Sequence, residues 1–306
     1  LNGGEEPTLG TPATPTFSDV RNTPNAAWAE KYIESCVSQG IVSGVGGGRF
    51  SPNGNVTGSQ LAKMLLVCLG FDSDIEGYTG NAWDMNVNVR ATQKGLYKGL
   101  EGLDVSAALT RDTAAQMVWN ALQAGEVKYE YTWGGGDATK GTAVDKLDNA
   151  NNPITLLKDK YNAEVKDGGI VTSVKEDSKG TYTLYMNGIT TKGQYTKVEG
   201  DYSNLIGQKV EVLYKDSENV YGVYASTDSS LIVESTAGKV EAVKNGEVKI
   251  DGTTYKVDSN VTTTALYTGK LIDGLNVGGN KAAAVKAYDN DDNGKIDTVV
   301  YVPFTA

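Results

Sequence analysis

The residues of this chain that are best arranged for chemistry form an acidic run near its C-terminal end. Side chains that carry oxygen stand at alternate positions, at Asp289, Asp291 and Asn293, and a turn-forming glycine follows them. The backbone carbonyl of Lys295 and the carboxylate of Asp297 complete the first nine positions of a calcium loop of the EF-hand type. Because hard cations need several oxygen ligands at short range, the spacing predicts a calcium site made by these five residues.

The loop departs from that pattern at its twelfth position, where Val300 replaces the usual bidentate glutamate. Its flanks, residues 283–288 and 298–302, alternate like strands, so we expect a loop between strands rather than between helices. A missing ligand implies weak binding, in the range of extracellular calcium modules. The alternative is a solvated acidic turn within a β-hairpin.

Composition excludes much other chemistry. The 306 residues include no histidine, so no Ser-His-Asp or Cys-His arrangement and no zinc site with histidine can form. The 38 acidic residues are dispersed among lysine and glycine, which predicts solvated surface rather than a carboxylate pair, and we expect no enzyme. A formal net charge of −10 disfavours nucleic acid, and no run of residues is long and apolar enough to span a membrane.

The N-terminal part of the chain contains two similar segments, residues 17–57 and 83–122, each with the pattern of a helix-loop-helix unit. The aligned positions are Trp28, Gly40, Gly44 and Val56-Thr57 in the first copy, and Trp83, Gly95, Gly99 and Leu109-Thr110 in the second. Each threonine is a candidate N-cap for a helix with an apolar stripe. The stripes are Leu61, Leu65, Cys68 and Leu69 in the first copy, and Ala114, Val118, Ala121 and Leu122 in the second.

The first copy, with its runs FSDV, GIVSG and GRFSPN, resembles the S-layer homology family of bacterial surface proteins. Residues 109–122, LTRDTAAQMVWNAL, resemble the second-helix signature of the same family, so the resemblance covers about the first two fifths of the chain. It implies binding of a pyruvylated wall polysaccharide through a Thr-Arg-Ala-Glu motif and an aspartate of the opening segment. Asp19 matches that aspartate, and of the motif's arginine and glutamate only the arginine is present, as Arg111 of the second copy. The first copy reads Thr57-Gly58-Ser59-Gln60 and lacks both the arginine and the glutamate.

Two pairs of residues keep more than one interpretation. Trp28 and Trp83 are either platforms on which a sugar stacks or core residues that seal each copy. Cys36 and Cys68 are either two buried thiols or the partners of a disulfide in an oxidising compartment.

Beyond about residue 126 the pattern changes to short alternating strands such as 210–214, 220–224 and 239–243, with Asn-Gly and Asp-Gly dipeptides between strands. The expected fold class is α+β and multidomain, with a helical repeat pair followed by mainly antiparallel β modules of sandwich or barrel type. The expected segments are an N-terminal arm at 1–16, the helical repeat domain at 17–125 and β domains at 126–226 and 227–306. One continuous β domain is an alternative to the last two. Rich in Gly, Pro and Thr, the arm is a candidate for strand addition to another subunit.

Together these features predict a secreted, structural, self-assembling protein of the bacterial cell surface, forming an S-layer or a filament from copies of itself. The main alternative is a protein that binds cell-wall polysaccharide through its repeats, and a secreted enzyme is the third. The start of the sequence would fit a mature end left after a signal peptide is cleaved.

Overall fold

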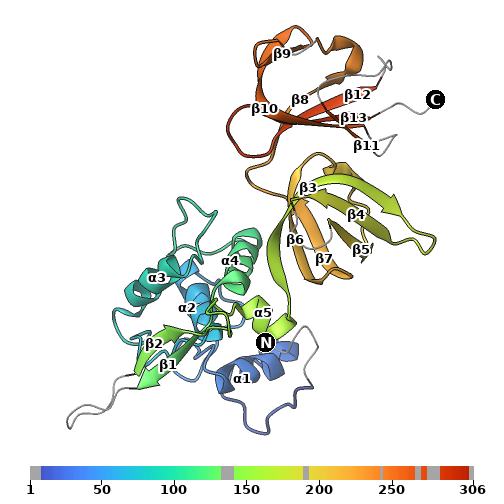
Figure 1. Ribbon diagram of the computed structural model, residues 1–306. Helices are drawn as coiled ribbons and strands as arrows, with labels where there is room; N and C mark the ends of the chain where they lie inside the picture. Colours follow the sequence, from blue (N-terminus) through green and yellow to red (C-terminus); the bar gives the residue numbers. More distant parts are fainter. Residues whose placement is uncertain are drawn as a thin grey trace. The chain divides into compact units, whose positions relative to one another are not determined.

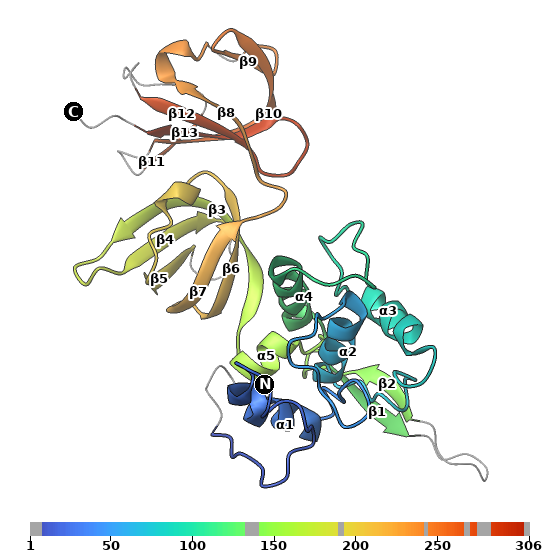
Figure 2. The same ribbon diagram turned by 180° about the vertical axis from the view of Figure 1, so that it is seen from behind.

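The computed structural model describes residues 8–131, 141–188, 193–241, 244–265, 270–273 and 283–302. The chain folds into two compact units, one ending at Asn162 and the other beginning at Ala163 (Figures 1 and 2). The fold is α+β, since every α-helix of the described ranges lies in the first unit and the second is built from mostly antiparallel sheets.

The first unit combines short helices with a two-stranded antiparallel sheet. Its elements are η1 (Ala27–Ala29), α1 (Glu30–Ser38), α2 (Gly58–Cys68), α3 (Trp83–Gln93), α4 (Arg111–Gln123), β1 (Val127–Tyr131), β2 (Gly141–Asp145) and α5 (Leu156–Tyr161). Helices α1 and α2 belong to the first copy of the repeat, and α3 and α4 to the second. None of the helices within the described ranges has the length and apolar character needed to cross a membrane.

The two copies follow the same backbone path after their first helices. Gly40 follows α1 with a φ of +70°, and Gly95 follows α3 with a φ of +71°. Gly44 and Gly99, four residues further on, both have a φ of +75°. Residues with a side chain rarely adopt this left-handed conformation, which explains why both copies place glycine at these positions.

Three helices of the unit begin in the same way. Thr57 caps α2 in a complete capping box with Gln60, and Thr110 caps α4 by accepting a hydrogen bond from Thr113 N–H. Thr155, which the sequence did not single out, caps α5. The residue before each cap is apolar, and Ile154 accepts a 2.9 Å hydrogen bond from Glu126 N–H as Val56 does from Leu109 N–H. The first unit therefore continues to Asn162, past residue 125, because α5 and the β1–β2 sheet pack with the helices.

The core of the unit lies between α2, α3 and α4. Leu66, Leu69 and Met117 are fully buried there, and Leu156 joins them from α5. In the predicted stripe of α2, Leu65 and Leu69 are buried and Leu61 and Cys68 are half-buried against the core, but the stripe of α4 is wrong at Val118, which is 41% exposed. The adjacent Met117 points inward instead, because the buried face of α4 runs through Met117, Asn120 and Ala121.

The second unit starts with a module that we call the first β module, a five-stranded antiparallel sheet. Its elements are β3 (Glu164–Glu176), β4 (Tyr182–Asn187), β5 (Gln194–Val198), η2 (Ser203–Leu205), β6 (Lys209–Asp216) and β7 (Asn219–Ala225), with strand order β5-β4-β3-β6-β7. The sheet curls into a half-barrel (Figure 1), and Thr196 N–H in β5 donates a 2.8 Å hydrogen bond to Ser217 O, in the turn between β6 and β7. The strands predicted at 210–214 and 220–224 are confirmed within β6 and β7.

The second β module is a six-stranded sheet that follows the connection 226–229. Its elements are β8 (Ser230–Thr236), η3 (Ala237–Lys239), β9 (Glu247–Ile250), β10 (Thr253–Ala265), β11 (Lys270–Asp273), β12 (Ala284–Asp289) and β13 (Ile296–Val302). The strand order is β11-β10-β13-β12-β8, with β9 beside β10, and the pair of β10 and β13 is parallel.

Within this module the strands beside the acidic run and two tight turns match the predictions from sequence, and one predicted strand does not. The strands expected around the acidic run are confirmed, because β12 and β13 pair antiparallel on either side of it. The strand predicted at 239–243 is wrong at its start, where η3 ends at Lys239 and Val240 forms only an isolated bridge, while residues 242 and 243 lie outside the described ranges. The turns at Asn245-Gly246 and Asp251-Gly252 have the positive φ angles expected of tight hairpins.

The arm packs on its own chain where it is described. Thr16 donates from its N–H and its hydroxyl to the carboxylate of Glu34, both at 2.7 Å. Pro12 O accepts a 3.3 Å hydrogen bond from Arg21. Residues 8–16 form no strand within their own chain, and strand addition to another subunit stays a prediction; residues 1–7 lie outside the described ranges.

Candidate functional site

A groove of about 630 Å³ lies on the first unit, lined mainly by residues of the first copy of the repeat. One wall is formed by loop residues 41–45 and 50–56 of the first copy, and the other by α2, residues 78–80 and Trp83. Gly44 lies in the first wall, where a Cβ atom would come within 2.6 Å of Arg49 O and would also overlap the ring of Phe17. Only glycine therefore allows this loop to fold so tightly.

Lys63 is a basic residue that lines the groove. It projects from α2, is half-buried, and lies 5.9 Å from the ring centre of Trp83. Burial lowers its pKa, although the charge of Asp74 acts in the opposite direction. Lys63 makes no ion pair with any residue that the structure describes. A cation beside an aromatic face that forms no ion pair within the described part of the chain is a suitable partner for an anionic ligand that also presents an apolar face.

Asp19, predicted to bind glycan, holds the loop that forms one wall of this groove. Its two carboxylate oxygens accept hydrogen bonds from Phe50 N–H at 2.9 Å and from Ser51 N–H at 2.8 Å. The bond from Phe50 is the main cause that lowers the pKa of Asp19, with that from Ser51 adding to it. Phe50 and Ser51 line the groove and Asp19 does not, so in this structure Asp19 positions the loop.

The other predicted glycan residues occupy different environments. Trp28 is 71% exposed, with its indole N–H bonded to Asn25 O at 2.9 Å and its ring 6.1 Å from that of Tyr32. Trp83 instead packs against the helical core and lines the groove. Arg111 is exposed at the start of α4. Neither Trp28 nor Arg111 lines the groove, so of the four residues only Trp83 does.

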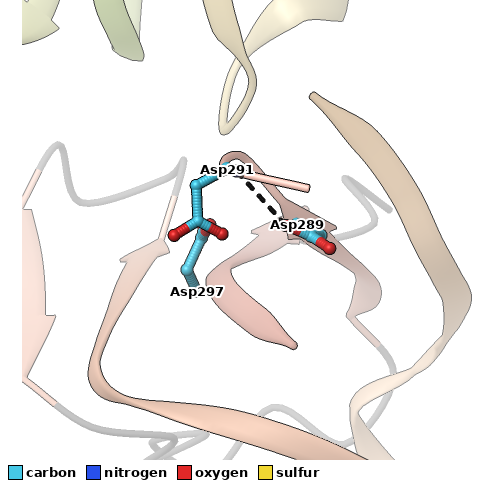
Figure 3. A group of neighbouring side chains, drawn as sticks. All are labelled: Asp289, Asp291 and Asp297. Carbon is cyan, nitrogen blue, oxygen red and sulfur yellow. Dashed lines mark hydrogen bonds between the residues drawn. The ribbon is translucent and has the colours of Figure 1, made fainter. Parts of the chain in front are cut away.

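The acidic run forms the turn between β12 and β13, and it gathers three carboxylates. Asp289, Asp291 and Asp297 each place one oxygen within 4.8 Å of the others (Figure 3). Asp289 is buried, Asp297 is half-buried and Asp291 is exposed. Asn293 Nδ2 donates a 2.9 Å hydrogen bond to Asp291 Oδ2, and Asn293 Oδ1 accepts a 2.9 Å hydrogen bond from Lys295 N–H. Three of the five predicted calcium ligands therefore lie together as oxygen donors.

The surroundings shift the pKa values of Asp289 and Asp297 in opposite directions. Burial acts to raise the pKa of Asp289, but hydrogen bonds from the N–H groups of Gly294, Asp291 and Asn293 outweigh it, and the pKa is lowered. The pKa of Asp297 is raised, first by burial and then by the nearby charge of Asp291. A hard cation would relieve this repulsion, and carboxylates are its preferred ligands.

The two cysteines are free and half-buried, so the structure contains thiols at Cys36 and Cys68. Burial raises the pKa of both thiols, which makes them poor nucleophiles.

Sequence reasoning missed Lys63, because nothing in its spacing along α2 distinguishes it from an ordinary surface lysine. The available signal was Gly58, which stands where the family motif has its arginine, so that position of the motif has no cation in the first copy. It also missed Asn290, the polar residue of the acidic turn that is most completely hydrogen-bonded.

Comparison with known families finds one match, in the first copy. Residues 16–62 match the model of the S-layer homology domain, the family that the first copy resembles in sequence. The second copy lies outside that match.

Two relatives align with nearly all of the chain at low identity. A "Cell surface protein" of Thermoanaerobacter kivui is 25% identical over 295 residues, which cover 93% of this chain and 34% of the relative. "S-layer protein EA1" of Bacillus anthracis is 23% identical over 287 residues, covering 93% of this chain and 27% of the relative. The chain thus spans between about a quarter and a third of the length of these relatives. No solved structure matches it.

Proposed function

We propose that this chain is part of a structural protein of the bacterial cell surface, of the S-layer type, whose copies associate with one another in a layer or filament. The observation that carries the proposal is the match of residues 16–62 to the S-layer homology domain, in a chain that aligns along 93% of its length with two surface proteins. It follows that the protein acts outside the cell and has a structural rather than an enzymatic role.

Two features of the chain support this role. The absence of histidine removes the commonest acid-base residue of enzymes. The described polar clusters of the first unit are largely internal ion pairs, such as Glu126 with Lys146 at 2.7 Å and Glu76 with Arg90 at 2.7 Å, which stabilise the fold.

Sedimentation velocity of the purified chain tests the association. We expect the sedimentation coefficient to increase with protein concentration, with a growing fraction of large species. A single monomeric species at every concentration would count against self-association of this chain.

A second function, binding of cell-wall polysaccharide, is favoured by the groove of the first unit. The ring of Trp83 offers a face for a sugar ring, Lys63 offers a cation for a carboxylate on that sugar, and Gln60 adds an amide. The groove thus fits an acidic saccharide. Its cation comes from Lys63, whereas the sequence pointed to Arg111.

Binding of the chain to purified bacterial cell walls, measured by co-sedimentation, tests this function. We expect Lys63→Met to weaken binding by roughly tenfold or more, because a hydrogen bond to a charged group contributes about 1.5–3 kcal/mol. Lys98→Met is the matched control, since Lys98 is exposed on the same unit and does not line the groove. Equal binding by both variants would mean that the groove is not the binding site.

We also propose that the acidic turn binds calcium through Asp289, Asp291 and Asp297. Calcium should raise the melting temperature of the chain, because a ligand that binds only the folded state stabilises it. Asp291→Asn should reduce this rise, while the neighbouring Asp292→Asn, outside the carboxylate cluster, should not. A melting temperature that does not respond to calcium would identify the run as a solvated turn.

A further inference from the structure

Asn290 lies in the acidic turn at the place where the two β modules of the second unit meet. Its side chain is almost completely buried, with 4% of its surface exposed. Burying an amide is unfavourable unless its donors and acceptors are satisfied, so the partners of this residue show what it is built to do.

The side chain makes two hydrogen bonds to the first β module. Its Nδ2 donates to Gly207 O at 3.0 Å, and its Oδ1 accepts from Lys209 N–H at 2.7 Å. The Oδ1 atom also accepts from the hydroxyl of Ser229 at 2.6 Å, in the connection between the modules. Because Lys209 N–H can only donate and Gly207 O can only accept, the orientation of the amide is determined by its partners.

The same residue is fastened to its own module. Its backbone N–H donates to Asp297 Oδ2 at 2.6 Å, and its Nδ2 approaches Asp297 Oδ1 at 3.0 Å and Thr298 Oγ1 at 3.1 Å. Both ends of the amide therefore contact groups that are themselves held in place, Lys209 in β6 and Thr298 in β13. One side chain thus bridges two sheets and their connection.

Apolar packing surrounds this polar bridge. Tyr288 and Val300 of the second β module are buried in the core of the first β module. Gly207 approaches them so closely that a Cβ atom there would overlap Val300 and lie 3.0 Å from Tyr288 Cε2. Water is thereby kept away from the hydrogen bonds of Asn290, which strengthens them.

We infer that Asn290 is a latch that locks the two β modules into one body. The turn that carries the latch is thus a joint of the second unit, whether or not its carboxylates bind a cation. Without the latch, the packing of Tyr288 and Val300 would still join the modules, but the buried hydrogen bonds that fix their orientation about the connection 226–229 would be lost. This inference does not depend on the proposed surface function.

Hydrogen exchange of the full-length chain tests the latch. Asn290→Ala should speed exchange of the Lys209 amide roughly tenfold or more, because that amide loses its buried acceptor. Asn293→Ala is the matched control, since Asn293 is exposed in the same turn and its described hydrogen bonds stay within that turn. It should leave exchange at Lys209 unchanged. Equal exchange at Lys209 in both variants would overturn the inference.

Calorimetry of the same variants measures whether the modules still unfold together. The unaltered second unit is expected to unfold in one transition, and Asn290→Ala should split that transition in two. If Asn290→Ala does not fold, Ser229→Ala removes only one of the bonds to Oδ1 and should produce a smaller rise in exchange at Lys209. No rise in that variant would count against the latch.

Discussion

Replacement of Gly207 by alanine tests how tightly the two β modules are joined. Gly207 has a φ of +89°, in the left-handed region, and packs directly against the second β module. An added Cβ atom would overlap Val300 Cγ2 and lie 3.0 Å from Tyr288 Cε2. Both of those residues are buried, so neither can move without disturbing the core.

Two costs add at this position. The left-handed conformation costs an L-residue about 1–2 kcal/mol relative to glycine. Overpacking a well-packed core costs a further ~1–3 kcal/mol. Gly207→Ala should therefore lower the free energy of unfolding of the second unit by about 2–5 kcal/mol.

Gly252 supplies the matched control. Its φ of +84° is almost the same, but no atom lies within 4 Å of the position that its Cβ would occupy. Gly252→Ala should cost only the conformational part, about 1–2 kcal/mol. Urea denaturation of the full chain, followed by circular dichroism of the sheets, gives both values. An equal fall in the free energy of unfolding in the two variants would show that Gly207 does not contact the second β module as it does in the structure.

Three further results are expected in the first unit. Thr57→Ala should lower the free energy of unfolding by about 1 kcal/mol in urea titration, because it removes the capping box of α2. Met117→Ala should cost about 2–5 kcal/mol by the same assay, whereas Val118→Ala, on the exposed side of α4, should change it by less than about 0.5 kcal/mol; a reversed order would refute the burial of α4. The N–H groups of Phe50 and Ser51 lower the pKa of Asp19 in the folded chain. The ionised Asp19 therefore stabilises the fold above the ordinary aspartate pKa of about 4, and this stabilisation is lost as the pH falls through the lowered pKa of the folded chain. The melting temperatures of the chain and of Asp19→Asn should therefore converge below about pH 4, and a constant difference would contradict that role.

Local patterns of the sequence predicted much of the fold. The glycines after α1 and α3, the threonine caps of α2 and α4 and the hairpin dipeptides act over a few residues, so their effect can be read from the chain alone. The acidic turn between two strands was predicted for the same reason, since its residues are neighbours in sequence.

Features that depend on contacts between distant segments could not be predicted. The amphipathic pattern of α4 allowed either Met117 or Val118 to face inward, and only the packing of α2 and α5 decides between them. Asp19 matched a family motif, but its partners lie about thirty residues later at Phe50 and Ser51. Asn290 lies 81 residues from Lys209, its hydrogen-bond partner, so no local signal marks it as a bridge.

Electron microscopy of the purified chain, in calcium and again after chelation, tests most directly whether this is a self-assembling surface protein. Ordered layers or filaments in calcium are expected, and their loss on chelation would implicate the turn from Asp289 to Asp297 in the contacts between copies. Monodisperse particles in both conditions, at every protein concentration, would contradict self-assembly and favour a role limited to wall binding.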